Sequence, residues 1–189
     1  MENTYPLLNR AREYVSNFAE KIGFESKRFS EKDFAEMIGL QGKINDASNK
    51  IELDITDKQA YFSLGESLYS LFMDNYLIKR QVNENILNDS IEALSKVKDI
   101  LSLQNSRRVL LDSLADNDKE LLVRTLFYLS KAHLEKAHMA CRKNDRGDVY
   151  FHLGLAEANK EIVTTYSDIA EVEIYYKRAE EIRNMLDNS

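Results

Sequence analysis

Apolar side chains recur every three to four residues along most of the chain, and no segment alternates apolar and polar positions as a strand would. The first helix is predicted from about Pro6 to Ile22, with an apolar stripe at Leu7, Leu8, Ala11, Tyr14, Val15, Phe18 and Ile22. A short helix follows, which opens at Ser30 with the capping-box pattern SEKD and which Gly39 ends. The weaker spacing of residues 40–55 leaves open whether they are helical.

The clearest pattern belongs to a long central helix, predicted at about 57–82. TDKQ forms a second capping box at its start, with Thr56 as the N-cap. Apolar side chains surround much of this helix, so it should be central or covered by another element. One of its stripes consists of Tyr61, Leu64, Leu68, Leu71 and Ile78, and the other consists of Phe62, Tyr69, Met73 and Tyr76.

The second stripe, formed by Phe62, Tyr69, Met73 and Tyr76, has two interpretations. In the first, the rest of the bundle and the N-terminal helices cover it. In the second, it lines an apolar groove that binds an amphipathic segment of a partner protein, since tyrosine and methionine make broad, adaptable contacts. The sequence leaves open whether this stripe is covered or open.

Further helical regions follow the central helix. The run NENILND (83–89) interrupts the pattern, and another helix is predicted after it. Asn117 is expected to cap a long helix as NDKE, and this helix ends at the turn KNDRGD (143–148). Asp148 then caps a return segment at 148–187, which is either one helix or two with a break at TTYSD.

Together these elements predict an all-α fold. Short links favour antiparallel neighbours, and therefore an up-and-down antiparallel helical bundle of about four long helices at 56–189. Residues 1–55 are expected to form an N-terminal helical extension with extra short helices, and the whole chain to make one compact domain. The helices near 118–170 are too long for a 34-residue repeat, which favours a bundle over a tetratricopeptide array.

Composition narrows the classes of function. The 189 residues are 43% apolar and 31% charged with a net charge of −6, as in ordinary globular proteins. The negative charge argues against nucleic-acid binding, and no segment has the ~20 apolar residues of a membrane span. The single cysteine allows no internal disulfide and no signal-peptide pattern is present, so the chain is expected to be cytoplasmic.

The three histidines and the only cysteine lie within residues 133–152, and this crowding raises the question of a chemical site. Glu135 and His138 form an E-x-x-H pair on one helix face, as carboxylate-bridged di-iron bundles require, but no second E-x-x-H occurs. Lys131 and Arg142 share that face, so we interpret the pair as solvent-exposed. No metal and no cofactor are predicted.

Two catalytic interpretations of the same run are weaker. Arg146 and His152 fit the loose R-x4–6-H spacing of HEPN-type ribonucleases, yet they straddle a turn. Cys141 lies in the last turn of a helix, where the dipole disfavours negative charge, so we interpret it as a small, partly buried packing residue. His133 is expected at the core or its boundary, and the histidines are expected on different sides of two helices. No residue is predicted to be catalytic, and an enzyme is the minority interpretation.

SLFMDNYLIKRQV (70–82), EALSKVKDIL (92–101) and LSKAHLEKAHMACRKND (129–145) carry a resemblance to a known family. The first is similar to the L-M-L-Y-D-G-A-L-x-F-L helix of the flagellin export chaperones, the FliS family, with Asp74 in the place of its aspartate. The second is similar to that family's next long helix, and the third to its Y-x-x-x-R-L-x-x-A-N-x-K-N-D segment. The resemblance covers about residues 65–170.

The resemblance implies a cytoplasmic, non-catalytic, chaperone-like bundle in flagellar or secretion export. Its protein partner would be flagellin, another export substrate or a co-chaperone, whose helical or unfolded segment folds across the apolar groove as it binds. The N-terminal helices are a candidate occupant of the groove when no partner is present. Two alternatives stay open: a small helical enzyme, HEPN-like or metal-dependent, and an oligomeric scaffold whose apolar seam at 172–186 pairs with another copy.

Overall fold

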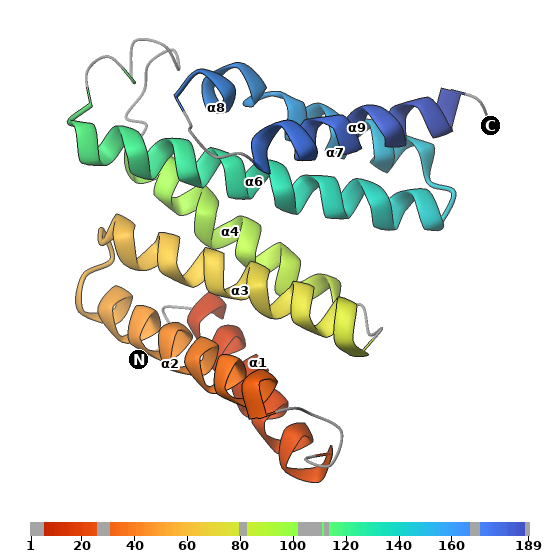
Figure 1. The fold of residues 1–189 in the computed structure, drawn as a ribbon. Coiled ribbons are helices and arrows are strands. Elements are labelled where there is room, and N and C mark those ends of the chain that lie inside the picture. The colour runs from red at the N-terminus through yellow and green to blue at the C-terminus, as the bar shows by residue number, and fades with distance from the viewer. Residues whose placement is uncertain are drawn as a thin grey trace. The chain divides into compact units, whose positions relative to one another are not determined.

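Every regular element is an α-helix in the part of the chain that the computed structural model describes (Figure 1). This confirms the predicted all-α fold class. The described backbone comprises residues 6–25, 31–79, 83–101, 111, 114–166 and 171–187, and the description excludes the side chains of 18–25, 31–34, 76–79, 171 and 187.

Contacts divide the chain into two compact units, Met1–Ile100 and Leu101–Ser189. The division falls after Ile100, so the first unit includes helices on both sides of residue 55. The boundary between an extension at 1–55 and a bundle at 56–189 stays a prediction, and so does the up-and-down order of the whole bundle.

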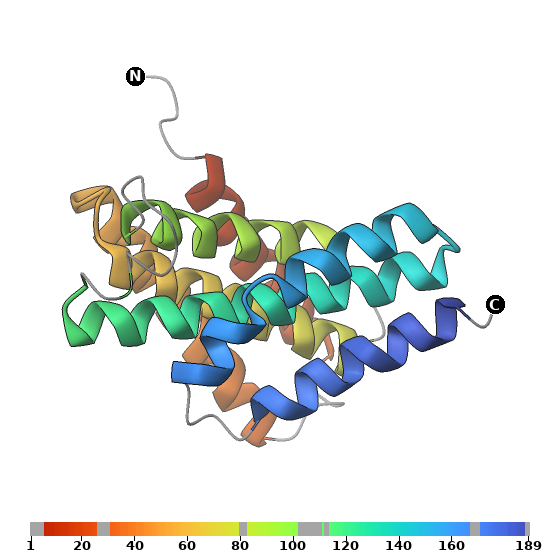
Figure 2. The same ribbon diagram turned by 90° about the horizontal axis from the view of Figure 1, so that it is seen from above.

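The first unit is built from helices that follow one another with short links. They are α1 (Pro6–Glu25), α2 (Glu31–Leu53), α3 (Lys58–Lys79) and α4 (Glu84–Leu101) (Figures 1 and 2). α2 packs along α3, and α1 contacts α2. Helix α4 begins within the run NENILND, so the prediction that this run interrupts the helical pattern is wrong beyond its first residue.

Helix α2 is continuous through both of its glycines, so the prediction that a short helix ends at Gly39 is wrong. Residues 40–53, whose structure the sequence left open, are helical. A Cβ at Gly39 or Gly42 would meet no atom within 4 Å, so both glycines face open space. The opposite stripe is buried, and this packing outweighs the low helix propensity of glycine. The buried stripe consists of Met37, Ile44, Ala47 and Ile51.

The N-terminus of α3 is capped by Asp57, which lies one residue after the predicted cap. The Ala60 N–H donates to Asp57 Oδ1 at 2.9 Å. Thr56 instead donates its N–H and hydroxyl to Asp54 Oδ1, at 2.9 and 2.7 Å, and these bonds hold the pKa of Asp54 below its ordinary value. A carboxylate is a strong acceptor at both positions, so it competes successfully with the threonine hydroxyl.

Helices α3 and α4 approach each other closely at Gly65. A Cβ at this position would lie 2.6 Å from Leu94 Cγ and 3.2 Å from the Leu94 backbone nitrogen. The absence of a side chain also leaves the Gly65 carbonyl within reach of α4, and the Ser90 hydroxyl donates to it at 2.7 Å. The glycine is therefore a packing requirement of the α3–α4 contact.

The second unit is a helical hairpin with two further helices. The described elements are α6 (Asp116–Arg142), α7 (Arg146–Glu157), α8 (Lys160–Tyr166) and α9 (Glu171–Asp187). Helix α6 packs along α7, and α9 contacts both of them. The return segment 148–187 is interrupted by a turn at residues 158–159, which the sequence did not predict. The predicted break at TTYSD (164–168) falls on the last residues of α8 and on residues 167–168, and these last two lie outside the described part.

The turn between α6 and α7 lies in the first half of the predicted KNDRGD run, at residues 143–145, and Asn144 adopts the left-handed backbone conformation with φ 57°. Residues 146–148, which were also predicted to belong to the turn, form the start of α7. Two predicted caps are wrong. Asp145, not Asp148, caps α7, and its side chain accepts the Asp148 N–H at 3.1 Å. Ala115, not Asn117, is the N-cap residue of α6, and it makes no side-chain capping bond.

The core of the second unit joins α6, α7 and α9. Its apolar cluster contains Leu134, Ala137, Ala140, Val149, Leu153, Ala156, Ala179, Ile182 and Leu186. Cys141 and Tyr175 are partly buried against it, so the interpretation of Cys141 as a packing residue is confirmed. Across the described segments, no helix is both long and apolar enough to cross a membrane.

Candidate functional site

His133 on α6 and His152 on α7 meet across the hairpin, so the prediction that the histidines lie on different sides of two helices is wrong for this pair. Their Nδ1 atoms are 3.2 Å apart, and the ring centroids are 5.3 Å apart with an interplanar angle of 22°. The centroid separation exceeds the nitrogen separation by roughly one ring diameter, so the two nitrogens point at each other, edge to edge. One Nδ1 must carry the proton and the other must accept it.

This head-on geometry decides what the histidine pair can do chemically. A metal ion needs two lone pairs that converge on one point, whereas these two nitrogens face each other along a line. Burial, and next the charge of Lys136, lower the pKa of His152, while Asp148 raises it. His133 is half-buried, as expected for a histidine at the core boundary. The pair shares one proton and ties α6 to α7.

Glu135 is 1% exposed, so the prediction that the Glu135–His138 pair lies on a solvated face is wrong. Arg178 of α9 donates from Nη1 to Glu135 Oε1 at 2.8 Å, and its Nη2 lies 3.2 Å from His138 Nδ1. A guanidinium can only donate, so His138 Nδ1 accepts and the proton of the neutral ring is on Nε2. Burial, and next the charge of Arg178, lower the pKa of His138.

Lys131 shares the face of Glu135 and was one of the two residues from which that face was predicted to be solvated. It too is covered by α9. Its ammonium lies 4.8 Å from the ring centroid of Tyr175 on α9, and 5.2 and 5.0 Å from those of Phe127 and Tyr128 on α6. These are cation–π distances. The face of α6 that carries Lys131 and Glu135 is therefore a contact with α9 and is not a solvated surface.

The remaining chemical candidates are a metal site and the Arg146–His152 pair. Among the described residues, no group of three or more His, Cys, Asp or Glu side chains is placed to hold a metal ion. Arg146 is exposed at the first position of α7, while His152 faces His133. The HEPN-type interpretation of this pair stays a prediction.

The predicted partner-binding stripe runs along one side of α3. Phe62 is 1% and Tyr69 is 4% exposed, and Met73, one turn further, is half-buried. The side chain of Tyr76 lies outside the described residues. Burial of Phe62 and Tyr69 agrees with the interpretation in which the stripe is covered, and its role in binding a partner stays a prediction.

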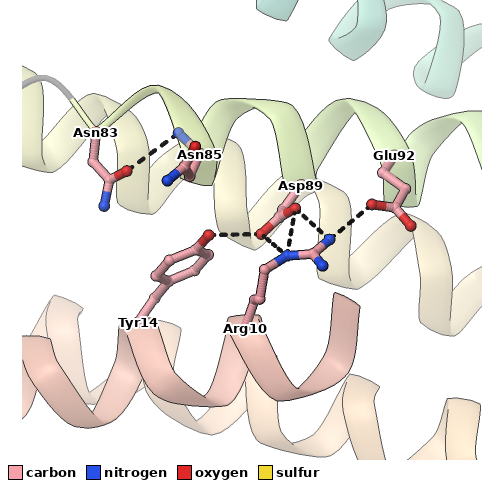
Figure 3. Close-up of polar contacts among 6 residues, drawn as sticks. All are labelled: Arg10, Tyr14, Asn83, Asn85, Asp89 and Glu92. Carbon is pink, nitrogen blue, oxygen red and sulfur yellow. Dashed lines mark hydrogen bonds and ion pairs between the residues drawn. The ribbon is translucent and has the colours of Figure 1, made fainter. Parts of the chain in front are cut away.

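A polar cluster that the sequence did not predict connects α1 to α4 (Figure 3). Asp89 is 4% exposed and accepts from Arg10 through both carboxylate oxygens, with Nη2–Oδ1 at 2.8 Å and Nε–Oδ2 at 3.0 Å. Tyr14 donates to the same carboxylate at 2.7 Å, and Arg10 Nη2 also donates to Glu92 at 2.9 Å. The Asp89 bond raises the pKa of Arg10, and burial followed by the Asp89 bond raises that of Tyr14.

A second polar contact holds the other flank of α1. Arg12 donates to Glu52 Oε1 at 2.6 Å and to Asn49 Oδ1 at 2.8 Å, both on α2. The Glu52 bond raises the pKa of Arg12, and the Arg12 bond lowers that of Glu52. Helix α1 is thus held to α4 on one flank and to α2 on the other.

The sequence contained a usable signal for the α1–α4 cluster. Tyr14 was assigned to the apolar stripe of α1, and a buried tyrosine needs a partner for its hydroxyl. Asp89 is followed by buried Ser90, and the apolar spacing of Ile86, Leu87, Ala93, Leu94 and Val97 continues through it. A carboxylate in such a register indicates a buried ion pair, although the arginine that pairs with it cannot be identified from spacing alone.

The chain was compared with family models, with curated proteins and with solved structures, and none of them matches it.

Proposed function

We propose that this chain is a non-catalytic, chaperone-like interaction protein that binds a helical or unfolded segment of another protein along α3. The binding row consists of Phe62, Tyr69, Met73 and Tyr76. The resemblance of three segments to the flagellin export chaperones makes an export substrate, such as flagellin, or a co-chaperone the first class of partner to test.

One observation carries the proposal: burial decreases along the row toward the C-terminal end of α3. Phe62 and Tyr69 are nearly inaccessible, whereas Met73 is half-buried. A partner segment is therefore expected to contact Met73 first and to extend the contact only as Tyr69 becomes uncovered. Methionine suits such an entry point because its flexible side chain adapts to different apolar partners.

Site-specific photo-crosslinking in cells tests this proposal. A photoreactive amino acid is placed at Met73 and, as the matched control, at Met185, which is exposed on α9. One defined protein should be crosslinked at residue 73 and be absent at residue 185. Equal crosslinking at both positions, or none at residue 73, would contradict the proposal.

A further inference from the structure

We propose that the surface of α2 and α4 that holds α1 is a docking surface for amphipathic helices with an arginine on each side of their apolar stripe, and that a helix of another protein with this character exchanges with α1. The acidic docking surface is defined by Asn49, Glu52, Asp89 and Glu92. The proposal is independent of the binding row on α3, since none of these residues lies on that helix.

Helix α1 has the features of a ligand seated in a receptor. Its inward stripe of Leu7, Leu8, Ala11 and Val15 is buried. At 3.6 residues per turn, Arg10 and Tyr14 lie on one side of this stripe and Arg12 lies on the other. Each flank reaches an acidic group of a different helix: Asp89 and Glu92 on α4, and Glu52 on α2. This is the helix-in-groove mode of recognition, with charges added on both sides.

Charge complementarity decides which partner fits the surface. The docking surface contributes three carboxylates, and the face of α1 that meets it contributes two guanidinium groups. An acidic helix placed here would leave the buried carboxylate of Asp89 without a cation, which is costly in a site this poorly exposed to water. The expected partner therefore repeats the pattern of α1, with two adjacent apolar residues and with arginines three and five positions after the first of them.

Within the docking surface, Asp89 is the residue that discriminates most strongly between partner helices. Asp89 receives a two-oxygen contact from Arg10 and a hydrogen bond from Tyr14. Lysine cannot reproduce such a fork, because it presents a single ammonium group. A partner helix with arginine at this position is therefore expected to bind more tightly than one with lysine.

The exchange can be measured with the full chain. A protease recognition sequence is inserted at residues 26–30, the protein is cleaved there after purification, and a fluorescein-labelled peptide YPLLNRAREYVSNFAE is added. Fluorescence anisotropy should show that the labelled peptide replaces α1. A peptide with both arginines changed to glutamate should bind at least about tenfold more weakly, because it loses the charge-assisted hydrogen bonds.

Two further variants keep the test decisive. Asp89→Asn in the chain should weaken binding of the unmodified peptide about as much as Arg10→Ala in the peptide, because both remove the same contact. Asp89→Arg should favour a peptide carrying Arg10→Glu over the unmodified peptide. Equal affinity of the unmodified peptide and the peptide with both arginines changed to glutamate would overturn the proposal. The proposal would also be overturned if α1 of the cleaved protein never exchanged with the peptide. The same holds if the cleaved protein unfolded and added peptide did not restore its helical circular dichroism.

Discussion

Replacing Gly65 with alanine is expected to destabilise the first unit, although alanine is the better helix former. The new Cβ would lie 2.6 Å from Leu94 Cγ and 2.9 Å from Leu94 Cδ2. Leu94 is fully buried, and its backbone nitrogen is only 3.2 Å from the same point, so α4 itself must shift. Overpacking of this kind costs about 1–3 kcal/mol, against a helix-propensity gain of about 1 kcal/mol.

A matched control separates the two contributions to stability. Gly42→Ala lies in the middle of α2, where a Cβ meets no atom within 4 Å, so it should stabilise the unit by about 0.5–1 kcal/mol. The two variants should therefore differ by about 1–3 kcal/mol in urea unfolding followed by circular dichroism, at an unchanged slope. If Gly65→Ala stabilised the protein as much as Gly42→Ala, the close α3–α4 contact would be refuted.

The remaining predictions concern α6 and its contact with α9. Glu135→Gln should lower the free energy of unfolding by about 1–3 kcal/mol because it weakens the buried pair with Arg178, whereas Glu120→Gln at an exposed position should change it little. His138 and His152 have lowered pKa values, so the unfolded chain binds more protons than the folded one below the ordinary histidine pKa of about 6.5. Stability should fall as the pH drops through this value, and a variant with asparagine at both histidines should lose less over the same range; parallel pH profiles would contradict this.

Periodicity was sufficient for the all-α class, and the composition of KNDRGD was sufficient to place the turn between α6 and α7, because both signals are local in the sequence. The packing role of Cys141 was inferred from its place in the last turn of a helix, where the dipole disfavours a thiolate, and the structure places it partly buried against the core. Periodicity failed for α2, where Gly39 and Gly42 are common signals for a helix end. Packing of the opposite face against α3 holds that helix together, and no local pattern reports such a contact.

The side-chain contacts could not be predicted for the same reason, because their partners lie even further away along the chain. Glu135 looked exposed because lysine and arginine share its face, but Arg178 lies 43 residues further along the chain and covers it. The Arg10–Asp89 contact spans 79 residues. In each case the pairing residue is chosen by the path of the chain, so spacing can indicate that a buried charge needs a partner without identifying that partner.

The exposed surface of α9 bears on the oligomeric-scaffold alternative. Ala179, Ile182 and Leu186 of the apolar seam at 172–186 pack within the core of their own unit. The apolar side chains that α9 leaves exposed are Ile174 and Met185. Pairing with another copy through the seam would therefore have to compete with this internal packing, and light scattering of the purified protein measures whether copies associate.

The proposed binding row on α3 is tested most directly by the affinity of the crosslinked partner segment for two glutamate variants, measured by isothermal titration calorimetry. Met73→Glu places a charge at the half-buried end of the row, and Met185→Glu makes the same change on exposed α9. We predict that Met73→Glu weakens binding at least about tenfold, because an unpaired carboxylate is costly in an apolar contact, and that Met185→Glu leaves it unchanged. Equal affinities of the two variants would contradict the proposal.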